Sequence, residues 1–288
     1  QTHTMEIHKV RAYTLLEDGD EVKFKEWILA VPSRLNALDE DQRTPLHWTC
    51  ALRKAAPLAH WLLTDERTRD QLRCDTTDDG GWTPLMSAAA VGDLALVSAL
   101  LKTKAASQLA AQNSSGNTAL HYAAGKKHVD VCRALLEAAD PAASAADPAG
   151  SPPALASTGG RALMEVRNRY GESALHRAAA AGCPETVRLL APLVSDTQPL
   201  SAHCYRGINT VLHLAAQAGG HGGLESVRYL LGLDPQLALV TNTEKQRAAD
   251  VSASKGICKL IESYEEKLQQ EPKSSGTVSE EGDAPQYI

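Results

Sequence analysis

Residues 116–136, GNTALHYAAGKKHVDVCRALL, are the stretch that decides the fold. A Gly-containing turn leads into Thr118-Ala119-Leu120-His121, a short Ala-rich run follows, and a second amphipathic run ends at Leu135-Leu136. This order predicts a turn, a helix, a second turn and a second helix. A unit of this size cannot bury its own apolar face, so it needs similar units on both sides.

The chain supplies such units in series. They begin at TPLHWTC (44–50), TPLMSAA (83–89), TALHYAA (118–124), SALHRAA (173–179) and TVLHLAA (210–216), with a decayed copy, RAADVSA, at 247–253. Each second run carries apolar residues at i, i+3 and i+4, one stripe of a helix. The period and the TPLHxA signature resemble ankyrin repeats. We therefore predict an all-α repeat fold, an ankyrin-repeat solenoid of helix-turn-helix units with β-hairpin fingers between them.

The repeats predict one domain over residues 5–268. We expect an N-terminal capping repeat at 5–37, repeats at 38–137, a disordered insertion at 138–162, repeats at 163–253, a C-terminal capping helix at 254–268 and a disordered acidic tail at 270–288. The insertion is rich in Ala, Pro, Gly and Ser and nearly free of bulky apolar residues. This composition favours a loop that leaves the stack without breaking it.

Composition narrows the class of protein. The chain has 288 residues, 43% of them hydrophobic, and a net charge of −6, which argues against non-specific nucleic-acid binding. It contains no run of 18 apolar residues and no signal-peptide pattern, so we expect no membrane association. The six cysteines are scattered without a CxxC pair, which is typical of reduced thiols in a cytoplasmic and nuclear protein. We expect a monomer.

Catalytic chemistry has little support in the sequence. Four histidines recur at one repeat position: His47, His121, His176 and His213. A metal site needs ligands that converge, whereas repeat-equivalent residues lie about one repeat apart, so we expect a Thr–His hydrogen bond in each turn instead. No GxSxG, Walker A, HExxH or kinase motif is present. We therefore predict that the protein is not an enzyme and binds no cofactor or metal. The enzyme alternative would require an unrecognised active site in the insertion, and the insertion contains no plausible set of catalytic residues.

A repeat stack of this kind binds proteins through its concave side. Glu40, Asp41, Asp78 and Asp79 put acid on the first two fingers, Arg43 flanks them, and Lys126, Lys127, Arg169 and Arg177 continue with basic charge. Each of these could instead be a solvated surface charge. Trp48 and Trp82 lie next to finger turns, where aromatic anchors become binding hot spots. Trp48 could instead pack between repeats, and Trp82 is the better surface candidate. The candidate partner-binding residues are Asp41, Arg43, Asp79, Trp82, Lys126, Trp48, Lys127 and Arg177.

Four sequence blocks support a closer resemblance: DEDQRTPLHWTC (39–50), DDGGWTPLMSAAAVG (78–92), NTALHYAAGKKHVDV (117–131) and GESALHRAAAAG (171–182). They resemble, in the same order, the successive repeats of the gankyrin family and its fungal members, which are proteasome assembly chaperones. The likeness covers roughly residues 8–265 without the insertion. The two Trp-containing blocks are its most specific part, because ankyrin repeats in general do not require those tryptophans.

The resemblance implies a non-catalytic chaperone. Such proteins bind the C-terminal domain of one AAA ATPase of the proteasome regulatory particle, the third regulatory-particle triphosphatase, during assembly of the base. Matched residue by residue, the acidic pair that faces the ATPase falls on Asp41 and Asp79, and the basic pair falls on Arg43 and Lys126. The alternative is an ankyrin-repeat adaptor that regulates a kinase or a transcription factor.

Overall fold

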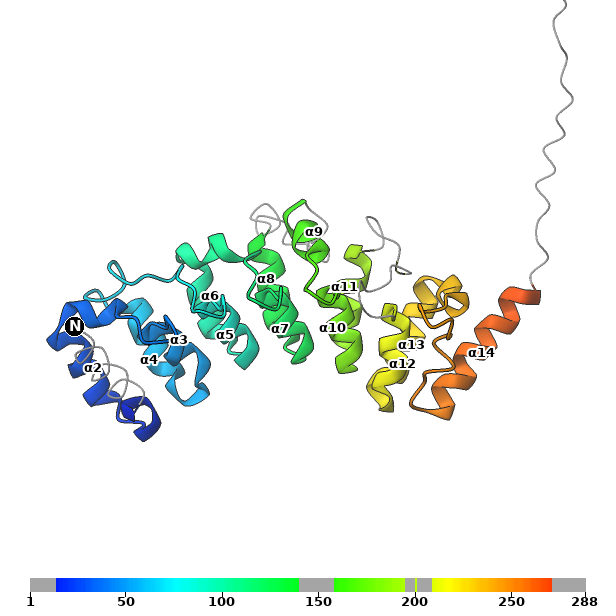
Figure 1. Ribbon diagram of the computed structural model, residues 1–288, viewed down its shortest axis with the longest axis horizontal. Helices are drawn as coiled ribbons and strands as arrows, with labels where there is room; N and C mark the ends of the chain where they lie inside the picture. Colours follow the sequence, from blue (N-terminus) through cyan, green and yellow to red (C-terminus); the bar gives the residue numbers. More distant parts are fainter. Residues whose placement is uncertain (1–13, 140–157, 195–199, 201–208, 271–288) are drawn as a thin grey trace, which may run out of the picture.

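The computed structural model describes residues 14–139, 158–194, 200 and 209–270. Helix pairs stack side by side into one elongated arch (Figure 1). The predicted N-terminal helix is described only from Thr14, which begins a helical segment over 14–18. The predicted acidic tail lies outside the described residues apart from Gln270, and Cys204 lies outside them as well. In the part that is described, no helix is long and apolar enough to cross a membrane.

Two layers of helices build the arch. The first helices of the repeats are α3 (Pro45–Ala51), α5 (Pro84–Val91), α7 (Ala119–Gly125), α10 (Ala174–Ala181) and α12 (Val211–Ala218). The second helices are α4 (Ala56–Thr64), α6 (Leu94–Leu101), α8 (Val129–Ala139), α11 (Pro184–Val194) and α13 (Gly220–Leu233). Within each layer a helix packs against the equivalent helix of the next repeat. Helices α5, α7 and α10 line the inner side of the arch, with α6, α8 and α11 outside them (Figure 1).

The ends of the array are closed by other elements. Helix α2 (Glu21–Ala30) covers the first repeat, and α14 (Lys255–Gln270) covers the last, where we predicted a helix at 254–268. Short 3₁₀ segments follow the second helices or the capping helix at Pro32–Asn36, Lys104–Gln108 and Pro235–Leu239, and another, Arg53–Ala55, joins α3 to α4 within the first repeat.

Helix boundaries follow from capping chemistry. The hydroxyl of Thr83 accepts a hydrogen bond of 3.1 Å from the backbone N–H of Met86 and so satisfies a free donor at the start of α5. Glycine ends two of the first helices, because Gly92 and Gly182 are C-caps with left-handed φ values of 83° and 64°, a conformation that glycine adopts without steric cost. In the third repeat Lys127 occupies the same position, with φ 66°.

Alanine makes the inner layer close-packed. The pairs Ala88–Ala89, Ala123–Ala124, Ala178–Ala179 and Ala215–Ala216 are all buried, and small side chains let neighbouring first helices approach closely. The second helices contribute larger groups, and the predicted stripe residues Val97, Leu100, Cys132, Leu135 and Leu136 are buried. The single core therefore runs along the whole array as one cluster.

Three features differ from the sequence predictions. Both ends of the insertion expected over 138–162 are helical, because α8 continues to Ala139 and α9 covers Thr158–Glu165. Helix α9 packs against α8 and α11, with Leu163 and Met164 only 4% and 3% exposed. The intervening residues 140–157 lie outside the described residues. Burial of two apolar side chains stabilises a helix that composition alone disfavours.

The second difference concerns the decayed copy at 247–253, which forms turns where the other repeats have their first helix. Arg247 stands where a capping Thr or Ser is expected and pairs with Asp250 and with Glu265 of α14. The third difference concerns the fingers, which were predicted as β-hairpins and are tight turns in the structure. Among the described residues the strand-like pairing is one isolated antiparallel bridge between Thr241 and Arg247.

Candidate protein-binding face

A buried Asp or Asn shapes each described finger. Asp39 Oδ1 accepts hydrogen bonds of 2.9 Å from the backbone N–H groups of Asp41 and Arg43. The same role falls on Asp78, Asn113 and Asn168, each five positions before the cap of a first helix, and on Asn242, five positions before Arg247. Such Asx turns fix the loop conformation. The sequence did not predict this role, and Asp78, expected among the surface acids, is only 7% exposed.

Backbone hydrogen bonds join the first four fingers to one another. Asp79 N donates to Asp41 O at 2.9 Å, and Ser114 N donates to Gly80 O at 2.7 Å. Arg169 N donates to Ser115 O at 3.0 Å, so the connection continues past the insertion. The fingers therefore form one linked edge along the array.

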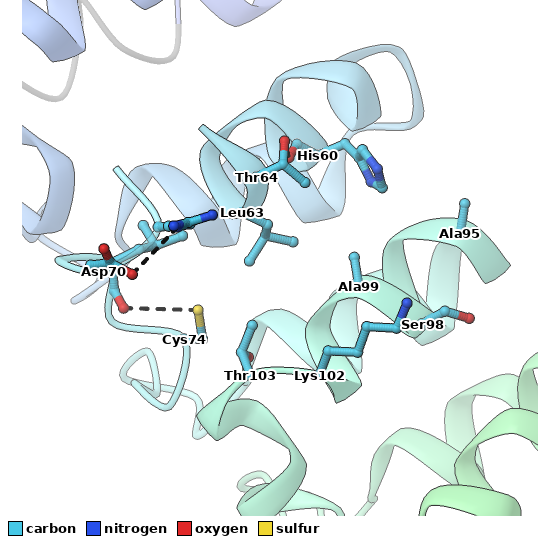
Figure 2. A pocket seen from close by; sticks show the side chains of 12 residues that line it. His60, Leu63, Thr64, Asp70, Cys74, Ala95, Ser98, Ala99, Lys102 and Thr103 are labelled. Carbon is cyan, nitrogen blue, oxygen red and sulfur yellow. Dashed lines mark hydrogen bonds and ion pairs between the residues drawn. The ribbon is translucent and has the colours of Figure 1, made fainter. Parts of the chain in front are cut away.

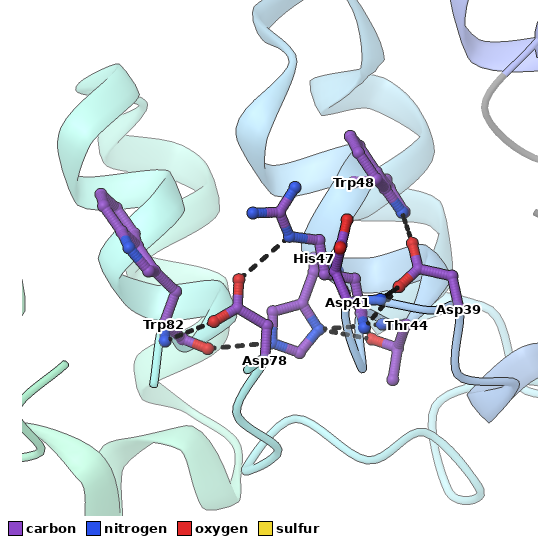
Figure 3. A network of polar contacts seen from close by, with 8 residues as sticks. Asp39, Asp41, Thr44, His47, Trp48, Asp78 and Trp82 are labelled. Carbon is purple, nitrogen blue, oxygen red and sulfur yellow. Dashed lines mark hydrogen bonds and ion pairs between the residues drawn. The ribbon is translucent and has the colours of Figure 1, made fainter. Parts of the chain in front are cut away.

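Asp39, Trp48 and Asp78 lie in a polar and aromatic cluster between the first two repeats (Figure 3). Arg43 belongs to the same cluster through its contacts with Trp48 and Asp78. The indole Nε1 of Trp48 donates to Asp39 Oδ2 at 2.7 Å, which fixes the ring. The guanidinium of Arg43 lies 4.9 Å from the Trp48 ring centre and donates through Nε to Asp78 Oδ2 at 3.0 Å. The ion pair uses one of the five N–H donors of Arg43, and the others can bind a second acceptor.

Trp82 and Tyr122 extend this cluster to the third repeat. Their rings stack with centroids 4.3 Å apart and planes at 28°, and Tyr122 OH accepts from Asn113 Nδ2 at 2.6 Å. A cavity of about 200 Å³ lies between Trp48 and Trp82, lined also by Arg43 and Ser87. Both predicted tryptophans are half-buried and border the same hollow. Tyr122 was not predicted, although it follows its helix cap by four residues as Trp48 does.

The other predicted charges are spread around this cluster. Asp41 and Asp79 are exposed on adjacent linked fingers. Lys126 and Lys127 are exposed directly after α7. Arg177 forms an ion pair of 3.5 Å with Glu172, and its guanidinium lies against Gly125, next to Lys126. The structure thus places all eight candidate residues on fingers, first helices or the turns that follow them.

The repeated histidines are fastened within their turns. His47 Nδ1 lies 2.9 Å from the hydroxyl of Thr44, and the same contact joins His121, His176 and His213 to their capping residues. Nε2 of His121 donates to Glu172 O at 3.0 Å and so ties one repeat to the next. Burial lowers the pKa of His121 to about 4. Within the described segments, no group of three or more His, Cys, Asp and Glu could hold a metal ion.

A groove lies away from this face, between the second helices α4 and α6 (Figure 2). It measures about 820 Å³, and its lining includes His60, Leu63, Asp70, Cys74, Ala99 and Lys102. Burial raises the pKa of the Cys74 thiol, which works against a nucleophilic thiolate there. This groove therefore offers no activated nucleophile.

Comparison with known proteins identifies the family. A family model described as ankyrin repeats in three copies matches residues 16–103, 50–145 and 154–241. The chain belongs to the ankyrin repeat family. A solved ankyrin repeat domain, that of Bcl-3, matches 87% of this chain and 97% of its own with a TM-score of 0.56. At 20% sequence identity this likeness shows the fold alone.

Three relatives are similar to this chain in sequence, and two of them are named as proteasome subunits. This ankyrin repeat protein is 28% identical over 200 residues to the probable 26S proteasome regulatory subunit p28 of Saccharomyces cerevisiae. The aligned residues make up 69% of the chain and 75% of that relative. It is 37% identical over 86 residues to the 26S proteasome non-ATPase regulatory subunit 10 of Dictyostelium discoideum, covering 29% of the chain and 34% of the relative. An ankyrin repeat-containing protein of Schizosaccharomyces pombe is 33% identical over 111 residues, 38% of the chain and 44% of the relative.

Proposed function

We propose that this ankyrin repeat protein is a non-catalytic chaperone of the gankyrin type for assembly of the proteasome regulatory particle. Its partner would be the C-terminal domain of one AAA ATPase subunit, the third regulatory-particle triphosphatase. The observation that carries the proposal is the similarity to the Saccharomyces cerevisiae subunit p28 over 200 residues, 75% of that protein. The Dictyostelium relative is also named as a 26S proteasome subunit.

The geometry of the candidate face supports binding of a structured protein domain. Trp48, Arg43 and Trp82 are held by neighbours within the array, so little side-chain freedom is lost when a partner covers them. Large aromatic groups and arginine are the usual centres of protein interfaces. The exposed acids Asp41 and Asp79 and the base Lys126 surround them and can select a complementary partner.

The test is titration calorimetry of the chain against the purified ATPase C-terminal domain. Asp41→Arg combined with Asp79→Arg should abolish binding while circular dichroism stays unchanged, because both side chains are exposed. Loss of one partner in a desolvated interfacial ion pair costs about 2–5 kcal/mol, and rim charges cost much less. Compensating Arg→Glu changes in the ATPase domain should restore part of the affinity.

A charge-matched control separates a specific interface from overall charge. Glu66→Arg combined with Glu266→Arg makes the same change in net charge at exposed positions away from the fingers. This variant should bind like the wild type. Wild-type binding by the Asp41 and Asp79 double reversal would show that this face is not the interface. A native pull-down that recovers a kinase or a transcription factor, without ATPase subunits, would favour the adaptor alternative.

A further inference from the structure

The fourth finger carries an exposed pair, Arg169 and Tyr170, that the proposed interface does not use. Tyr170 is 58% exposed, and among the large hydrophobic side chains exposed in the described residues it is the aromatic one. Its backbone N–H donates to the buried Asn168 at 2.9 Å, so the turn that presents it is fixed. A tyrosine on a fixed turn offers a large amphipathic contact area at low entropic cost, because only two side-chain torsions must be ordered.

This pair keeps a fixed position relative to the first two fingers. Arg169 N is bonded to Ser115 O at 3.0 Å, and Asn168 Nδ2 donates to Asn117 Oδ1 at 3.0 Å. A Cβ added to Gly116, whose φ is 76°, would lie 2.8 Å from Arg169 N, so the third and fourth fingers touch through their backbones. The intervening insertion therefore does not separate them.

The charge and polarity of the exposed side chains change from finger to finger along this linked edge. We call its exposed tips, Asp41, Asp79, Ser114, Arg169 and Tyr170, the finger row. Acid occupies the first two fingers, a neutral hydroxyl the third, and a cation with an aromatic ring the fourth. A surface that matches the row is basic at one end and carries a carboxylate beside an apolar hollow at the other. The reverse orientation would bring like charges together, which disfavours it.

We propose that Arg169 and Tyr170 form a second anchoring contact for the same ATPase domain, with Arg169 on a partner carboxylate and Tyr170 in an apolar hollow beside it. This inference rests on the proposed function and adds the fourth finger to the binding surface. It also assigns the fourth finger a part in orienting the partner. The first two fingers and the fourth would hold the domain at two separated points.

The experiment measures affinity for the purified ATPase C-terminal domain by titration calorimetry with the full chain. Tyr170→Ala and Arg169→Glu should each weaken binding by about tenfold or more, as expected for interface hot spots. Tyr170→Phe should stay within about threefold of the wild type, because it keeps the ring. Arg169→Glu should also reduce the salt dependence of the association rate. Controls are Leu233→Ala and Arg133→Glu, which change an exposed apolar residue and an exposed arginine on second helices.

The outcomes separate the two proposals. If the wild type binds and both fourth-finger variants bind within about threefold of it, the second contact is overturned and the proposed function stands. If the wild type does not bind the ATPase domain at all, both proposals are overturned. If the variants weaken binding as expected while the two controls do not, the fourth finger is part of the interface. Circular dichroism of each variant excludes loss of fold as the cause.

Discussion

Arg43 donates through Nε to the buried carboxylate of Asp78 at 3.0 Å and so ties the first finger to the second. The side chain of Asp78 is 3% exposed and that of Arg43 is 36% exposed. Asp78 Oδ1 simultaneously accepts from Trp82 N at 2.8 Å. One carboxylate therefore shapes its own turn and orients an arginine of the candidate face. This arrangement gives Arg43 a structural role beside the binding role that the resemblance implies.

The two roles of Asp78 can be separated by mutation. Asp78→Asn keeps an oxygen for Trp82 N and loses the ion pair, and the equivalent fingers carry Asn113, Asn168 and Asn242. It should cost about 1 kcal/mol of unfolding free energy. Asp78→Ala removes both contacts and leaves a buried N–H without its acceptor, so it should cost about 2–4 kcal/mol. Urea unfolding measures both values. Equal losses would mean that the turn contact contributes nothing beyond the ion pair.

Two buried cysteines test the register of the repeats. Cys132 is fully buried on a second helix, and burial raises the pKa of its thiol to about 12. Cys132→Ser places a hydroxyl in an apolar site and should destabilise the chain by about 1–3 kcal/mol. Cys74, which precedes the second finger, is also buried, with 5% exposure and Sγ 3.9 Å from Leu72 O.

The Cys74 site differs from that of Cys132 in having this carbonyl as an acceptor. A serine hydroxyl at position 74 can donate to Leu72 O, so we expect Cys74→Ser to cost less than Cys132→Ser, about 1 kcal/mol or below. Chemical denaturation monitored by circular dichroism measures the difference. A larger cost at position 74 than at position 132 would contradict this account of the two sites.

The sequence predicts the repeated parts of this molecule well, because each repeat carries its own signals. The TPLH-type starts, the apolar stripes and the glycine stops are local patterns, and they match the helices observed. The same repetition contains a signal that the prediction did not use: Asp or Asn stands five residues before the caps Thr44, Thr83, Thr118 and Ser173, although not before Thr210. Asp78 and Asp79 are adjacent acids with opposite exposure, and only the geometry of the turn distinguishes them.

Contacts between repeats were harder to predict. The Trp82–Tyr122 stack joins two repeats and depends on the offset between them, which the pattern within one repeat does not contain. The first residues of α9, 158–162, were predicted as part of the insertion because that segment is rich in Ala, Pro, Gly and Ser. The stability of α9 comes from packing of Leu163 and Met164 against α8 and α11, a tertiary effect that overrides local propensity.

The buried part of α9 leads to a test of the insertion. Leu163→Ala should destabilise the chain by about 2–4 kcal/mol, because it leaves a cavity between α8 and α11. Replacing residues 140–157 with a short Gly/Ser linker should leave the melting temperature nearly unchanged, because their Ala, Pro, Gly and Ser content offers little to a core. Glu165→Ala, at an exposed position of the same helix, is the control. A linker variant that melts as early as Leu163→Ala would show that 140–157 also stabilises the array.

The last prediction concerns acid sensitivity. His121 Nδ1 accepts from the backbone N–H of Thr118 at 3.2 Å, so its ring is neutral with the proton on Nε2. Burial lowers the pKa of His121 to about 4 and also lowers that of His47, from an ordinary value of 6.5. Between pH 6.5 and about 4 the unfolded chain therefore binds protons that the folded chain does not. Stability is complete above pH 6.5 and falls as the pH decreases, by about 1.4 kcal/mol for each unit of pKa difference.

Urea midpoints at pH 7, 6 and 5 measure this loss in a range where few carboxylates titrate. His121→Gln removes the titrating ring, so its stability should change less over this range than that of the wild type, whatever its value at pH 7. His60→Gln, the same substitution at an exposed position, is the control. A wild-type slope in His121→Gln would mean that His121 does not account for the acid sensitivity. The ring would then have to protonate in the folded array, and Nδ1 could no longer accept the hydrogen bond that the backbone N–H of Thr118 now donates to it.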